Sequence, residues 1–241
     1  MGNVLKMLLL MFFCANVCIT AKGQSIEVTY VKAYKNHRDT TNTTPKTLKD
    51  LRYILTCNRN AAKFELVRFM ENDTRKENKR FLSRGGGDGV YYKNVIDSLK
   101  LHQLESFVDG KLYLINIPFE EYQWTITNET KKISNYTCYK AFTEFIIEVP
   151  DKIGSKMEEQ KYEIVVWFTP EINYSFGPAG FDGLPGLVLE KYSSSFYFIA
   201  SKIVFDKNNI KNIAKPQKGT YIDKAEYDKM IKTAYSRFLM N

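Results

Sequence analysis

The sequence has few of the residues that usually carry catalysis and metal binding. Histidine occurs twice, at His37 and His102, and cysteine occurs four times in 241 residues. A serine triad needs a histidine base, and neither histidine lies near a nucleophile motif such as Gly-x-Ser-x-Gly. A zinc site usually takes closely spaced His, Cys or carboxylate ligands, which these scattered residues do not supply. The sequence therefore indicates no catalytic residue, no metal and no cofactor, and it favours a non-enzyme.

Apolar runs long enough to cross a bilayer are also lacking. The N-terminal run Met7–Phe13 is too short, and it follows the charged Lys6 and precedes the small-residue site Ala21-Lys-Gly23. This pattern predicts a secretory signal peptide over residues 1–23. We expect residues 24–241 to be an exported single domain without a transmembrane segment. The alternative is an N-terminal membrane anchor.

No long run of one charge sign is present: the formal net charge of +8 is spread along the chain, with local density at Arg75-Lys76 and Lys79-Arg80. The Gly-rich stretch Gly85–Gly89 lacks the Gly-Lys-Ser/Thr ending of a phosphate-binding P-loop and leads into Val90-Tyr-Tyr. We therefore expect no nucleic-acid partner. The basic residues are interpreted as solvated faces, the alternative being contact with an anionic surface.

Only two cysteines remain after signal-peptide cleavage. Cys14 and Cys18 are removed, which leaves Cys57 and Cys138 in strand-like sequence. An even pair in an exported protein predicts one disulfide. The bond would close a loop of about eighty residues, worth on the order of 4 kcal/mol. The alternative is two buried free thiols.

What the sequence does contain is short alternating runs rich in β-branched and aromatic residues, which are typical of strands. The expected strands are Ile26–Tyr34, Leu51–Asn58, Ala61–Met70, Val90–Lys93, Lys111–Ile117, Gln123–Thr127, Thr137–Val149, Tyr162–Phe168, Leu187–Tyr192 and Phe196–Phe205. Asn36–Lys49 is expected to be a loop, and Glu71–Arg84 to be helical or irregular. So many strands predict a mainly β fold, with a curved antiparallel sheet or half-barrel.

The C-terminal segment Tyr221–Leu239 has the pattern of an amphipathic helix. Asp223 is placed to cap it, and Glu226 follows three residues later. Its apolar stripe consists of Tyr227, Met230, Ile231, Ala234 and Phe238. We expect this helix to cover an edge or the open mouth of the sheet.

The segment Ser175–Glu190 concentrates four glycines and two prolines in sixteen residues. Gly adopts backbone angles that other residues avoid, and Pro fixes φ, so the segment specifies one loop shape. Two interpretations remain open: a structural loop that sets strand register, or a recognition surface. The candidate binding residues are Trp167, Phe176, Gly177, Pro178, Phe181, Gly183, Leu184, Pro185 and Gly186.

Five motifs in order carry a family resemblance: Trp124–Ile133, Tyr136–Ala141, Val166–Ile172, Gly177-Pro178 and Gly183-Leu-Pro-Gly-Leu187. Together they closely resemble the GLPGLI family of exported Bacteroidota proteins, with Val188 at the final motif position. The resemblance covers residues 110–192 best. It implies a periplasmic or outer-membrane-associated protein, linked by gene neighbourhood to TonB-dependent transporters, and a sheet similar to that of periplasmic lipoprotein carriers. The family has no established activity, so this is association and not mechanism.

These observations favour an exported binding or accessory protein of the cell envelope, linked to outer-membrane transport. One alternative is a periplasmic carrier of a lipid or other hydrophobic ligand. It requires an apolar cavity of several hundred Å³, lidded by the C-terminal helix. A second alternative is a hydrolase, which requires carboxylates, a histidine and Tyr hydroxyls to converge in one cleft.

Overall fold

The computed structural model describes residues 24–34, 46–67, 86–150, 157–193, 196–206 and 210–239. The expected signal peptide, His37 and the charged segment Glu71–Arg84 lie outside these residues. Within the described ranges, no helix is both long enough and apolar enough to cross a membrane.

The described residues form twelve strands, one 3-10 turn and a C-terminal α-helix. The first six strands are β1 Ser25–Tyr34, β2 Lys46–Cys57, β3 Ala61–Leu66, β4 Val90–Asn94, β5 Leu99–Glu105 and β6 Leu112–Asn116. The remaining elements are β7 Thr125–Ile133, β8 Tyr136–Pro150, β9 Met157–Thr169, η1 Pro178–Gly180, β10 Leu187–Ser193, β11 Phe196–Asp206, β12 Thr220–Asp223 and α3 Lys224–Leu239.

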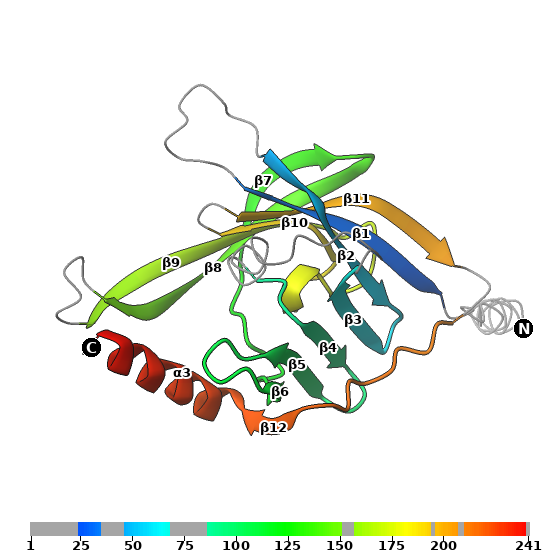
Figure 1. Ribbon diagram of the computed structural model, residues 1–241. Coiled ribbons are helices and arrows are strands. Elements are labelled where there is room, and N and C mark those ends of the chain that lie inside the picture. The colour runs from blue at the N-terminus through cyan, green and yellow to red at the C-terminus, as the bar shows by residue number, and fades with distance from the viewer. Residues whose placement is uncertain are drawn as a thin grey trace, which may run out of the picture.

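All twelve strands belong to one open, curved sheet (Figure 1). Its order is β12-β6-β5-β4-β3-β2-β1-β11-β10-β9-β8-β7. β1 lies in the middle and joins two meanders, β2 to β6 on one side and β11 back to β7 on the other. The prediction of a mainly β protein with a curved sheet and a C-terminal helix is confirmed.

Three details of the expected sheet were wrong. β12 pairs with β6 in parallel, because the chain returns to that edge through an irregular segment and not through a hairpin. β2 begins at Lys46, inside the expected loop Asn36–Lys49, because Lys46 and Thr47 pair with the end of β1. β5 was not expected, since the alternation over Leu99–His102 stops at Gln103.

Irregular pairing accompanies the curvature of the sheet. The register shifts between Thr29 and Tyr30 where β1 meets β11, and between Val188 and Glu190 where β10 meets β9. Bulges of this kind bend strands and increase their twist. The two meanders consequently share one core, and its large fully buried side chains include Tyr30, Tyr53, Phe64, Leu187 and Phe198.

The helix α3 covers the β12–β6 edge. Tyr227 packs edge-on against Tyr113 of β6 with ring centroids 5.5 Å apart, and Met230 and Ile231 pack against the same cluster. Asp223 directly precedes the helix, and its carboxylate accepts a hydrogen bond from Asn116 Nδ2 at 3.0 Å. The helix thus lies against β6 and β12 at that end of the sheet, which is one of the two positions expected for it.

The structure contains no Cys57–Cys138 disulfide, so this prediction was wrong. Both residues are buried free thiols. Four strands lie between β2 and β8 in the sheet, which corresponds to about 24 Å along it, whereas bonded cysteines have Cα atoms within about 7 Å. Burial raises the pKa of the Cys138 thiol to about 11 and that of Cys57 still further, so both behave as small apolar side chains.

Candidate functional site

The segment Ser175–Leu187, called the motif loop below, crosses the inner face of the curved sheet. Its 3-10 turn η1 packs against β3 and β4, on the opposite meander from β10 (Figure 1). Gly183 and Pro185 are exposed and Trp167 is half-buried. The other six candidate residues are buried: Phe176, Gly177, Pro178, Phe181, Leu184 and Gly186. The loop is therefore mainly a core element that joins the two meanders.

Backbone hydrogen bonds close the motif loop on itself. The amide of Val188 donates to the carbonyl of Phe176 at 3.0 Å, and the amide of Leu187 donates to that of Ile172 at 3.1 Å. These bonds tie the two ends of the loop together before the chain enters β10. The loop is thus held in one shape by its own backbone.

Two glycines of the loop are required by space. A Cβ atom at Gly177 would lie 2.5 Å from the carbonyl oxygen of Phe181 and 2.7 Å from Val188 Cβ. A Cβ atom at Gly186, where φ is +156°, would overlap the carbonyl of Thr169. At each glycine the nearest atom is a backbone carbonyl oxygen, which cannot move aside as the end of a flexible side chain can. The two glycines therefore permit the close packing of the loop on β9 and β10.

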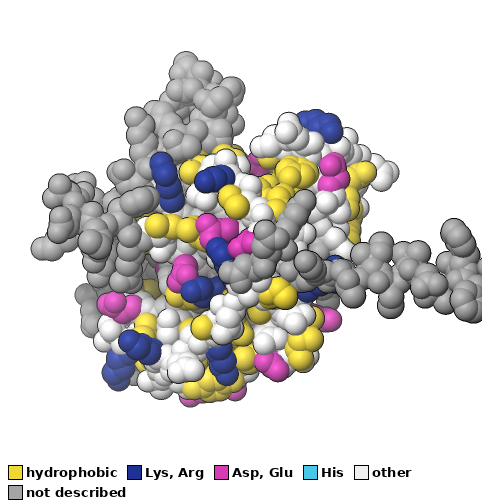
Figure 2. Space-filling model, turned by 90° about the vertical axis from the view of Figure 1, so that its right-hand side faces the viewer, with side chains coloured by type: hydrophobic (Ala, Val, Ile, Leu, Met, Phe, Trp, Pro, Cys, Tyr) yellow, Lys and Arg dark blue, Asp and Glu magenta, His cyan; other side chains and the backbone are white. Residues whose placement is uncertain are grey.

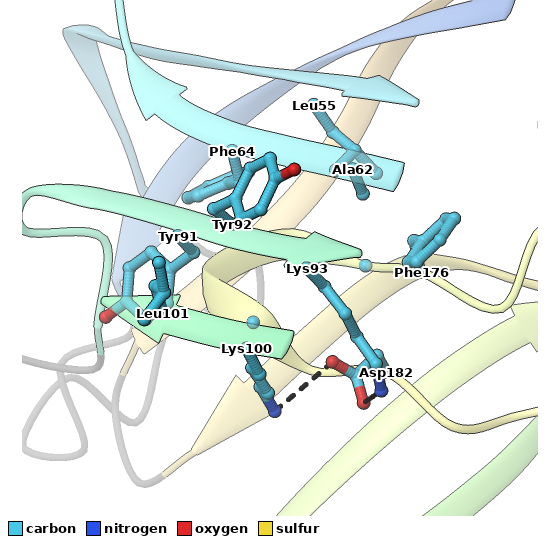
Figure 3. Close-up of a pocket in the computed structure, with 12 residues that line it drawn as sticks. Leu55, Ala62, Phe64, Tyr91, Tyr92, Lys93, Lys100, Leu101, Phe176 and Asp182 are labelled. Carbon is cyan, nitrogen blue, oxygen red and sulfur yellow. Dashed lines mark hydrogen bonds and ion pairs between the residues drawn. The ribbon is translucent and has the colours of Figure 1, made fainter. Parts of the chain in front are cut away.

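The carboxylate of Asp182 lies between two lysines from the opposite meander (Figure 3). Lys93 Nζ of β4 is 2.8 Å from Oδ1, and Lys100 Nζ of β5 is 3.2 Å from Oδ2. Lys100 Nζ is also 2.8 Å from Glu121 Oε2. The side chains of Asp182 and the two lysines are at most 11% exposed, so water screens these pairs weakly. This network attaches the motif loop to β4 and β5.

Aromatic side chains enclose the same network. Lys93 Nζ lies 4.1 Å from the centroid of the Phe119 ring, and Lys100 Nζ lies 4.7 Å from that of Tyr122. The Tyr122 ring stacks on Phe181 of the loop at 4.8 Å. Trp124 Nε1 donates to the carbonyl of Asp182 at 2.7 Å. The segment 119–124 thus forms a second wall around the lysines and Asp182.

Trp167 has a separate set of partners. Lys131 Nζ lies 4.3 Å from the centroid of its ring and 2.8 Å from Glu190 Oε2. The ion pair holds the ammonium over the indole, which favours a cation–π contact. Trp167 of β9 is therefore held by a lysine of β7 that also pairs with a glutamate of β10.

A small cavity opens beside the network. Its volume is about 20 Å³, and its lining includes Lys93, Lys100, Asp182, Phe64 and Phe176. That volume suits a single water molecule bound by polar groups, not an acyl chain. This cavity does not support the alternative of a lipid carrier.

Two further lysines lie buried in one cross-strand row. Lys32 of β1 is opposite Phe198 of β11, which is opposite Lys191 of β10, and both lysines are at most 1% exposed. Lys32 Nζ donates to the carbonyl of Gly86 at 2.6 Å, and Lys191 Nζ donates to Ser193 Oγ at 3.3 Å. Burial lowers the pKa of both lysines to about 7. The charge of Asp88 partly opposes this shift at Lys32, and the charge of Lys32 adds to the shift at Lys191.

These two lysines predict that the protein becomes more stable as pH rises from 7 to 8. In the unfolded chain both keep the ordinary pKa of 10.5, so above pH 7 the unfolded state binds more protons than the folded state. The free energy of unfolding then rises by up to about 1.4 kcal/mol per pH unit for each lysine. The increase in the free energy of unfolding ends at the pH where the two lysines are neutral in both the folded and the unfolded state. Above about pH 8.5, ionisation of the cysteine thiols in the unfolded chain opposes it. Urea denaturation at pH 7.0, 7.5 and 8.0 measures this slope.

The variant Lys191→Met isolates the effect. We expect it to be more stable than the wild type at pH 7 and to have a flatter pH dependence, because it removes one buried charge. Lys111→Met replaces an exposed lysine and should keep the wild-type slope. An unchanged slope in Lys191→Met would show that Lys191 titrates normally.

His102 and Asp88 hold the turn at residues 86–89. The His102 ring stacks on Tyr91 at 3.9 Å, and its Nε2 lies 2.7 Å from the carbonyl oxygen of Asp88. Because a carbonyl only accepts, Nε2 carries the proton. Burial lowers the pKa of His102. His37 lies outside the described residues, so the hydrolase alternative stays a prediction. Among the described residues, no group of three His, Cys, Asp or Glu side chains could hold a metal ion.

The buried lysines are the main residues of the site that the sequence did not predict. Lys32 offered a signal, because it continues the alternation of Val28 and Tyr30, both of which are buried. No sequence pattern indicates the burial of Lys93 and Lys100, because their partner Asp182 is distant in sequence. Asp182 lies 89 residues from Lys93.

Comparison with known proteins gives one partial family match. Residues 124–190 match a family described as a protein of unknown function (Porph_ging). The matched stretch runs from Trp124 through β7, β8, β9 and the motif loop to Glu190, and so includes all the motifs that carry the family resemblance. None of the curated proteins matches the chain.

Among solved structures, the fold is similar to that of PNGF-II. Its structures in space groups C2 and P21 both superpose with a TM-score of 0.53 at 18% sequence identity and cover 88% of this chain. The superposition covers only 33% and 34% of the two PNGF-II chains, so this chain spans about a third of the length of PNGF-II. At this identity the likeness shows the fold alone.

Proposed function

We propose that this protein is an exported binding protein of the cell envelope, acting as an accessory to an outer-membrane transport assembly. Its partner contacts the exposed edge of the motif loop at Gly183 and Pro185. The N-terminal signal pattern and the resemblance to the GLPGLI family support the location and the link to transport. The structural support comes from the loop itself.

One observation carries the binding role: buried and exposed residues alternate along the loop on a rigid base. Asp182, Leu184 and Gly186 are buried, whereas Gly183 and Pro185 between them face solvent. A surface already held in one conformation loses little entropy on binding. The Trp124 ring lies 3.8 Å from the position that a Cβ of Gly183 would take, which adds an amphipathic aromatic to this edge.

The ionisable groups around the loop support binding in preference to catalysis. Asp182, Lys93, Lys100 and Glu121 pair with one another and hold the loop in place. A general acid or base must instead reach a substrate atom. These groups thus serve the shape of the loop.

The proposal is tested by capture from an envelope extract of the source organism. Pro185→Glu places a charge on the exposed edge, and we expect recovery of the partner to fall about tenfold, equivalent to about 1.4 kcal/mol. Ser175→Glu places the same charge at another exposed position of the loop and should leave recovery unchanged. Near-ultraviolet circular dichroism establishes that both variants are folded. Equal recovery by Pro185→Glu and the wild type would refute the proposed surface.

A further inference from the structure

The strand β11 continues past its neighbour β10 (Figure 1). β10 pairs with β11 only from Phe196 to Ile199, whereas β1 pairs with β11 along its length. The stretch Ser201–Phe205 is called the β11 edge below. Among the described residues, its backbone makes no hydrogen bond on the side away from β1. Backbone N–H and C=O groups on such an edge are available for pairing with another chain.

The β11 edge also exposes large apolar side chains. Val204 is 42% exposed and Phe205 is 39% exposed. Phe205 lies opposite Ile26 of β1, which is buried, so the apolar inner face of the sheet continues as far as this edge. Figure 2 views the molecule from the side on which β11 ends and shows hydrophobic side chains exposed among charged ones. The edge is thus a surface that another strand would cover on two counts, backbone pairing and apolar burial.

The two terminal strands of the described sheet are less suited to such pairing. β7 has a register shift between Ile126 and Thr130, and irregularities of this kind interrupt an edge. β12 has only four residues, from Thr220 to Asp223. The β11 edge is longer than β12 and contains no shift between Lys202 and Phe205.

The sequence of the β11 edge indicates what covers it, because it is complementary to itself in antiparallel pairing. With Val204 on a twofold axis, Ile203 of each copy lies opposite Phe205 of the other. Pairs of β-branched and aromatic side chains stabilise neighbouring strands. Lys202 is the only charged residue of the edge. It lies opposite residue 206 of the other copy, an aspartate, so like charges do not oppose each other.

We propose that the β11 edge pairs with the β11 edge of a second copy of this chain, in antiparallel orientation about Val204. The contact joins two twelve-stranded sheets into one, and both copies use the same surface. Two paired segments of this length make a small interface, so the association is weak and depends on protein concentration. The β11 edge is separate from Gly183 and Pro185, so the inference goes beyond the function proposed above.

Sedimentation of the full-length protein over about a hundredfold range of concentration tests the association. We expect the average mass to rise from that of a monomer towards that of a dimer. In Val204→Lys two ammonium groups lie directly opposite each other, so the association should weaken at least tenfold. Val204→Thr keeps the strand propensity without the charge and should associate as the wild type does. Ile126→Lys introduces the same charge at an exposed position of β7 and should also leave the association unchanged.

Disulfide cross-linking tests the register of the two strands. In the proposed pair the two copies of residue 204 lie opposite each other, with Cα atoms about 5 Å apart, which suits a disulfide. Oxidation of Val204→Cys should therefore link the two chains. In Lys202→Cys the two thiols are separated by about 13 Å along the strands and should not link. The wild type gives the background from its own cysteines, of which Cys57 and Cys138 are buried.

The inference fails if the wild type stays monomeric at every concentration. Association of Val204→Lys as strong as that of the wild type refutes the location, and a loss in Ile126→Lys alone places the contact on β7 instead. Equal linking of the two cysteine variants refutes the register. Near-ultraviolet circular dichroism establishes that each variant is folded, and if Val204→Lys is not, the cross-linking decides. None of these outcomes bears on Pro185, so this inference and the proposed function fail independently.

Discussion

Replacing Gly186 with alanine is expected to lower the free energy of unfolding by about 3 kcal/mol or more. A Cβ atom at this position overlaps the carbonyl of Thr169 and lies 2.9 Å from Pro170 Cα. Overpacking a close-packed site costs about 1–3 kcal/mol, and an unfavourable backbone conformation adds about 1–3 kcal/mol. Because the obstacle is backbone, relief requires the loop to separate from β9. Urea denaturation followed by tryptophan fluorescence measures the loss.

Gly110→Ala is the matched control for this substitution. Gly110 also has a positive φ, of +68°, but no atom lies within 4 Å of its would-be Cβ. It therefore has only the conformational penalty, of about 1–2 kcal/mol. If Gly186→Ala loses no more stability than Gly110→Ala, the close approach of the loop to β9 is not what requires glycine.

The second large effect is expected from Asp182→Asn, which should lower the free energy of unfolding by about 3–5 kcal/mol. The amide keeps the shape of the side chain but removes the negative charge between Lys93 and Lys100. Breaking a buried pair leaves uncompensated charge in a medium that solvates it poorly. Lys100 retains Glu121, so most of the loss arises at Lys93. Chemical denaturation of the two proteins at one pH gives the difference directly.

Two further variants show whether charge is the cause. Adding Lys93→Met to Asp182→Asn should restore part of the lost stability, because it removes the charge that Asp182 had paired. Asp228→Asn breaks the exposed pair with Lys224 on α3 and should change stability by less than about 1 kcal/mol. A double variant that is no more stable than Asp182→Asn would contradict a role for buried charge.

Much of the fold could be predicted from local pattern. Apolar and polar residues alternate over Ile26–Tyr30, and the structure places β1 over Ser25–Tyr34. The C-terminal stripe predicted α3, which the structure begins at Lys224. The elements that were missed, β5 and β12, lack sustained alternation, and both pair with β6. Strand propensity is weak without cross-strand neighbours, so such strands cannot be found from their own residues.

The candidate site was predictable only in part. Four glycines and two prolines marked the motif loop as a specified shape, and the close contacts at Gly177 and Gly186 give the reason. The burial of most candidate residues was not predictable, because it depends on the opposite meander closing over the loop. The expected disulfide failed for the same reason: strand-like sequence around Cys57 and Cys138 says nothing about how many strands separate them.

The sequence by itself determined the class of the protein: a mainly β chain with a C-terminal helix and one loop whose glycines and prolines allow a single shape. Those properties depend on residues close together in the chain, where periodicity and backbone preference act. Only the tertiary structure decided what that loop does in the fold. The tertiary structure brings Asp182 to Lys93 and Lys100, buries Lys32 and Lys191 on either side of Phe198, and leaves Gly183 and Pro185 at the surface. Burial and charge pairing arise between residues far apart in sequence, so they depend on the order of the strands in the sheet.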